Sequence, residues 1–186
     1  KAKDYLLWFA LSALGSLMLL ACTNHITQNV ASVPFLWIVP LVLYLLSFIL
    51  VFDVSSSRGR SGWYSRPLFV VPLLALVVGM AYGLVERVTI HNVWMSVALY
   101  CGGMFVACMF CHGEMAALRP SPRYLTRFYL MLSVGGAVGG LSVGLLAPKL
   151  FRVYWELPGG FVACAALAVV VTLRGIRRPV AALAPL

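Results

Sequence analysis

The residues with the most distinctive chemical spacing form the run Cys108-Met109-Phe110-Cys111-His112. C-x-x-C-H is the attachment pattern of c-type haem, in which both thiols form thioethers and the imidazole ligates the iron. Here the run ends an apolar stretch, where two buried thiols and an interfacial imidazole are ordinary packing residues. We therefore expect no cofactor and no metal site, and a c-type haem carrier using Cys108, Cys111 and His112 stays an alternative.

A second polar group follows the same stretch and combines an imidazole, a carboxylate and three guanidinium groups: His112, Glu114, Arg119, Arg123 and Arg127. Arg123 and Arg127 are four residues apart and share one face of an expected helix. Glu114 is therefore predicted to pair with one of these two arginines and to latch the loop between two helices. Ser121 and Pro122 predict the N-cap and first turn of the second helix.

An uncharged polar segment at residues 23–33 is predicted to connect the first two apolar stretches. Its side chains can form hydrogen bonds with a ligand or a neighbouring protein, and a plain outer turn is the alternative. The candidate contact residues are Asn24, His25, Thr27, Gln28 and Asn29.

Glycines four residues apart mark the fifth apolar stretch. Such spacing predicts a smooth helix face that a second helix can approach closely. The order does not match a nucleotide-binding G-x-G-x-x-G loop, and no strand pattern precedes it. The candidate packing residues are Gly135, Gly136, Gly139, Gly140 and Gly144.

The elements that carry these residues follow from composition. Of the 186 residues, 62% are hydrophobic and 10% charged, against about 45–50% and about 25% in soluble domains. This balance excludes a cytosolic globular enzyme. Six apolar stretches have the length of a membrane-spanning helix; they are residues 5–22, 35–52, 68–85, 93–111, 128–147 and 159–173. We expect an all-α integral membrane protein with one six-helix bundle at 1–174 and a basic, then Pro- and Ala-rich tail at 175–186.

The distribution of Lys and Arg predicts the orientation. Of the 14 basic residues, 11 fall on the side that holds both chain ends and 3 on the other, if the six stretches cross alternately. The positive-inside rule then places both termini in the cytoplasm. The net charge of +9 is accounted for by loops beside lipid headgroups, so we expect the bilayer as a partner and no nucleic acid.

Chemistry inside the membrane is predicted to be sparse. No Asp, Glu, Lys, Arg or His lies near the middle of an apolar stretch, where ion-coupled transporters usually keep one. No nucleophile–base set or pair of carboxylates is evident. These observations favour a non-enzymatic protein.

The segment from Asn24 to Leu41, with the block Cys111-His112-Gly113-Glu114 and the run Glu156-Leu157-Pro158, resembles a bacterial family. It is similar to the membrane portion of fused major-facilitator/spermidine-synthase-like proteins. The resemblance implies a major-facilitator-like half-bundle in the bacterial inner membrane. No synthase-like nucleotide-binding pattern follows in this sequence, so polyamine synthesis is not expected.

The leading functional hypothesis is an accessory or scaffold subunit of a larger membrane complex, for example a respiratory or photosynthetic one, with other membrane subunits as partners. The alternative is a transporter-like half that handles a polyamine or another small solute, with the polar segments as gates.

Overall fold

The computed structural model describes residues 2–29, 34–52, 64–85, 93–150 and 156–182. These ranges contain helices and no strands. The longer helices are α1 (Ala2–Asn29), α2 (Ile38–Phe52), α3 (Arg66–Val85), α4 (Val93–Ala117), α5 (Leu125–Leu141) and α7 (Glu156–Ala182). Short helical segments are η1 (Pro34–Trp37), η2 (Pro122–Tyr124), η3 (Ser142–Leu146) and α6 (Ala147–Leu150).

Helix length and composition fit a membrane. Within the described ranges, five helical segments are long and apolar enough to cross a bilayer, and Arg66–Gly79 is a shorter apolar helix. The prediction of an all-helical chain with several helices long and apolar enough to cross a membrane is therefore confirmed. Because lipid tails are as apolar as the side chains they touch, many large hydrophobic residues can face outward without cost.

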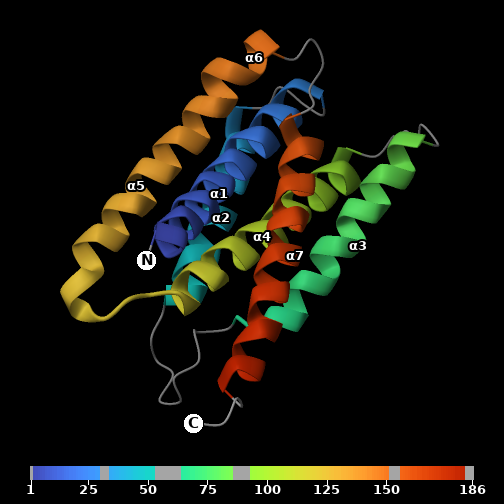
Figure 1. Cartoon of the computed structure of the whole chain (residues 1–186). Coiled ribbons are helices and arrows are strands. Elements are labelled where there is room, and N and C mark those ends of the chain that lie inside the picture. The colour runs from blue at the N-terminus through green and yellow to red at the C-terminus, as the bar shows by residue number, and fades with distance from the viewer. Residues whose placement is uncertain (1, 30–33, 53–63, 86–92, 151–155, 183–186) are drawn as a thin grey trace.

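The helices are arranged around α1 and α4 (Figure 1). Helix α1 packs against α5, α4, α7 and α2, and α4 packs against α2 and α3 as well. Helix α5 lies at one side of the bundle and α3 at another (Figure 1). The core accordingly follows the inward faces of α1 and α4, where Leu11, Met18, Met104 and Phe110 are fully buried.

The polar segment after the first apolar stretch is helical up to Asn29, and the expectation of a loop there was wrong. The Thr23 hydroxyl donates to the Leu19 carbonyl at 2.7 Å, and the Thr27 hydroxyl donates to the Thr23 carbonyl at 2.8 Å. These bonds satisfy the hydroxyls on their own helix, while Ile26 stays buried in the core. Polar composition therefore did not end the helix.

The end of α5 departs from regular α-helix. Residues Ser142–Leu146 form a π-helical turn before α6. Pro148 has no backbone N–H to donate to the Gly144 carbonyl, and the Ala147 N–H donates to the Ser142 carbonyl five residues earlier, as in a π-helix. The hydroxyl of Ser142, the first residue of the π turn, donates to the carbonyl of Gly139 in α5 at 2.7 Å.

The start of α5 also differs from prediction. Ser121 precedes the short 3₁₀ turn at Pro122–Tyr124, and its side chain forms no capping hydrogen bond. The Tyr124 N–H instead donates to the Ser121 backbone carbonyl at 2.9 Å. Pro122 does lie in the first turn, as predicted, because its fixed φ suits the start of a helix.

Candidate functional site

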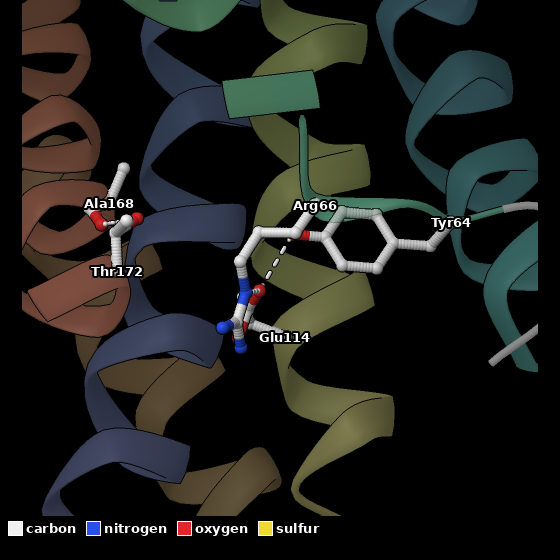
Figure 2. Close-up of polar contacts among 5 residues, drawn as sticks. All are labelled: Tyr64, Arg66, Glu114, Ala168 and Thr172. Carbon is white, nitrogen blue, oxygen red and sulfur yellow. Dashed lines mark hydrogen bonds and ion pairs between the residues drawn. The ribbon is translucent and has the colours of Figure 1, made fainter. Parts of the chain in front are cut away.

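The most strongly organised polar cluster joins α4 to the start of α3. The Glu114 carboxylate is 1% exposed, and the Arg66 guanidinium holds both of its oxygens. Arg66 Nε donates to Oε1 at 2.6 Å and Nη2 donates to Oε2 at 2.7 Å. The Tyr64 hydroxyl donates to Oε1 at 2.8 Å (Figure 2). The buried carboxylate thus receives three donors from one short segment of chain.

A glycine brings that segment against α4. The Tyr64 ring lies on Gly113, where an added Cβ would overlap the ring atoms. The Tyr64 ring also stacks with Phe69 of α3 at a centroid distance of 5.7 Å. Gly113 therefore permits a close approach that places the Tyr64 hydroxyl beside the neighbouring Glu114.

The electrostatics of this cluster favour a structural role. A buried carboxylate is costly unless it is paired and hydrogen-bonded, and Arg66 and Tyr64 meet both needs. Burial raises the pKa of the Tyr64 phenol, and the adjacent Glu114 carboxylate raises it further. Tyr64 therefore remains a neutral donor at physiological pH.

Thr172 on α7, also drawn in Figure 2, donates its hydroxyl to the Ala168 carbonyl of its own helix at 2.7 Å.

The expected partner of Glu114 was wrong. It pairs with Arg66 rather than with Arg123 or Arg127. The side chains of Arg123 and Arg127 are exposed, and Arg127 interacts with Tyr5 of α1. The sequence gives no reason to pair Arg66 with Glu114, because 48 residues separate them and no sequence pattern links the two.

His112 lies apart from that ion pair and is fully inside the bundle rather than at its interface, which corrects the sequence expectation. The Ser47 hydroxyl donates to the Tyr44 carbonyl at 2.7 Å, so its oxygen accepts the Nδ1–H of His112 at 3.0 Å. The Tyr44 and Phe48 rings meet the imidazole edge-to-face at 5.0 and 4.9 Å. These contacts hold the imidazole against α2.

The C-x-x-C-H side chains point to different helices. The Cys108 thiol lies 4.0 Å from the Gly15 carbonyl of α1, Cys111 interacts with Cys164 of α7, and His112 binds α2. Both thiols are buried and free. A haem bonded to them would have to displace packed side chains from three helices. In the described part of the chain no group of three or more His, Cys, Asp and Glu residues is placed to hold a metal.

The other polar candidates occupy the last turns of α1. His25 packs edge-to-face on Tyr100 of α4 at 4.3 Å. Asn24 and Thr27 are half-buried and Gln28 is exposed, while the side chain of Asn29 lies outside the described residues. These groups therefore form a helix end packed on α4 rather than a loop that could fold over a ligand.

The glycines of α5 divide into two groups. An added Cβ at Gly135 or Gly139 would strike the backbone carbonyl of Phe9 or Ala13 of α1, and one at Gly136 would lie 3.2 Å from the Ser16 hydroxyl. Close helix packing therefore involves these three positions. At Gly140 the contact is an ordinary 3.6 Å to Leu20, and at Gly144 no atom lies within 4 Å. These two glycines do not form the close α1–α5 contact; Gly144 belongs to the π turn.

The α1–α5 contact also includes a hydrogen bond. The Ser12 hydroxyl donates to the Leu132 carbonyl at 2.6 Å between the two helices.

Comparison of the chain with family models, curated proteins and solved structures found no match.

Proposed function

We propose that this chain is a non-enzymatic accessory or scaffold subunit of a larger complex in the bacterial inner membrane. It would be a major-facilitator-like half-bundle with both termini cytoplasmic. The buried polar groups support a structural role, because Glu114 and His112 bind side chains of neighbouring helices. Their hydrogen-bonding capacity is used to join α2, α3 and α4.

The observation that carries the assembly role is the uneven burial of the helices. In the apolar windows of α2 and of the α5 region, 17% and 22% of residues are buried within the chain, against 56% for α4. Helix α5 packs chiefly on α1, and it leaves Val134, Val138 and Leu141 exposed. Helix α5 therefore offers most of its circumference to lipid or to another membrane subunit.

A transporter-like half that handles a polyamine is the competing proposal. Its support is the buried carboxylate at the end of α4, a group that can attract an ammonium. Arg66 already neutralises Glu114 through two hydrogen bonds. A cationic solute would therefore have to displace Arg66, which makes the structural role the better supported of the two.

Photo-cross-linking tests the assembly role. A photoreactive residue at Val138 on α5 is compared with one at Val78 on α3, which is also exposed. After purification in mild detergent, we expect a stoichiometric membrane-protein partner cross-linked from position 138 and none from position 78. Equal labelling from both positions, or saturable solute uptake by the chain alone in proteoliposomes, would overturn the proposal.

A further inference from the structure

Two thiols from different helices lie together inside the bundle, Cys22 of α1 and Cys101 of α4. The Cys22 thiol donates to the Tyr100 carbonyl at 3.5 Å. The carbon of that carbonyl is bonded to the Cys101 nitrogen, so the Cys22 sulfur lies beside the Cys101 backbone. The two thiol groups also interact with each other. Both are free, and the structural role proposed above uses neither.

Helix packing holds the two thiols side by side. Helices α1 and α4 are in extensive contact. One turn after Cys22, the His25 ring meets the ring of Tyr100, the residue before Cys101, at 4.3 Å. Ile26 of α1, one further residue along, is fully buried. The pair is therefore part of a fixed contact between two helices.

The surroundings of the pair exclude water and lie close to lipid. Candidate spans end at Gln28 and begin at Trp94, so each thiol lies about 10 Å inside the apolar layer at a rise of about 1.5 Å per residue. Cys22 is 0% exposed and Cys101 is 4% exposed. Gly102 is exposed, and an added Cβ there would meet no atom within 4 Å. The surface beside Cys101 is therefore open to a small apolar molecule from the bilayer.

Two adjacent thiols can be oxidised together. A disulfide needs its sulfurs to approach to about 2 Å, and thiols that already interact on facing helices need only a small displacement. The reaction releases two protons and two electrons. A quinone takes up the same number to become a hydroquinone, and quinones are the bilayer-soluble acceptors that drive disulfide formation in bacteria.

We propose that Cys22 and Cys101 form a thiol pair that a lipid-soluble quinone oxidises to a disulfide, which links α1 covalently to α4. Both S–H bonds break and one S–S bond forms, while two electrons and two protons pass to the quinone oxygens. Cys111 and Cys164 also interact, but both are fully buried, so that pair is expected to stay reduced. The thiol pair is independent of the assembly role, and either proposal can fail without the other.

Thiol counting after quinone treatment tests the site. The full chain is reduced, placed in lipid nanodiscs and incubated without oxygen with a decyl-substituted benzoquinone, then denatured and alkylated with N-ethylmaleimide. The untreated chain has five cysteines to alkylate, and the treated chain should have two fewer. Peptide mapping should find a disulfide between Cys22 and Cys101, with one quinone reduced per chain.

Cysteine variants identify the reacting thiols. Cys22→Ala and Cys101→Ala should reduce no quinone. Cys108→Ala is the matched control, because Cys108 is also buried on α4 but its thiol lies against the Gly15 carbonyl. It should react as the native chain does. Quinone reduction by Cys22→Ala equal to that of the native chain would overturn the proposal.

A polar oxidant provides a second test that needs no variant. Oxidised glutathione at the same concentration should form the disulfide about tenfold more slowly, because its charged groups are costly to bring into the apolar layer. Equal rates with the two oxidants would show that the pair is reached from water and would overturn the proposal. A disulfide between Cys111 and Cys164, or disulfides between separate chains, in place of the bond from Cys22 to Cys101 would also overturn it.

Discussion

Arg66 and Glu114 form an ion pair through two hydrogen bonds, which joins the first residue of α3 to the end of α4. The two partners differ in environment, because the Arg66 side chain is 41% exposed and the Glu114 side chain is 1% exposed. Losing one partner is therefore not equivalent to losing the other.

Arg66→Gln should destabilise the bundle more than Glu114→Gln. The first change leaves a carboxylate in a buried site, at a cost of about 3 kcal/mol. The second leaves a guanidinium that can turn to water, at a cost of about 1–2 kcal/mol. Unfolding in detergent measures both, with the exposed Arg123→Gln as control. The reverse order would contradict the proposed geometry.

Alkaline pH should destabilise the native protein through Tyr64. The pKa of this phenol is raised in the folded state, so its contribution to stability is present below the unfolded pKa of about 10 and falls as pH rises above that value. Tyr64→Phe should lose about 1 kcal/mol at neutral pH and show a shallower decline above pH 10. Tyr129→Phe, which alters an exposed ring, should follow the native profile. Parallel profiles for all three proteins would refute this prediction.

Glycine substitutions in α5 should have unequal effects. Gly139→Ala places a methyl group against the Ala13 backbone of α1, which cannot move as a side chain can. We expect a loss of about 1–3 kcal/mol through overpacking. Gly140→Ala is the matched control, since its methyl group meets only Leu20 at ordinary contact distance. Similar thermal unfolding of the two variants would argue against the α1–α5 contact.

The native thiols should resist a small maleimide reagent. All five cysteines are free and buried, so labelling is expected only after denaturation. Ser121→Cys, at an exposed position in the loop between α4 and α5, provides the accessible control. Rapid native labelling of Cys108 or Cys111, or a Soret band that survives acid–acetone extraction, would contradict the packing of α4.

Several features of the site could not be predicted because they depend on which helix faces meet. In soluble helices, a polar stripe marks the outer face. Here most side chains are apolar around the whole helix, so the sequence pattern did not show that Gly139 contacts α1 while Gly140 does not. The partner of Glu114 was missed for the same reason, since the α3–α4 contact brings Arg66 close.

The sequence by itself determined that the chain is helical and suited to a membrane. Apolar content, the length of each apolar stretch and the distribution of charge can all be read along the chain without knowing which residues meet in the fold. Only the tertiary structure decided that the polar segment before Asn29 continues α1, that His112 is held by Ser47, and that Cys22 lies beside Cys101. The physical reason is that hydrogen bonds and close contacts act over a few ångströms. Their partners are therefore chosen by helix packing rather than by composition.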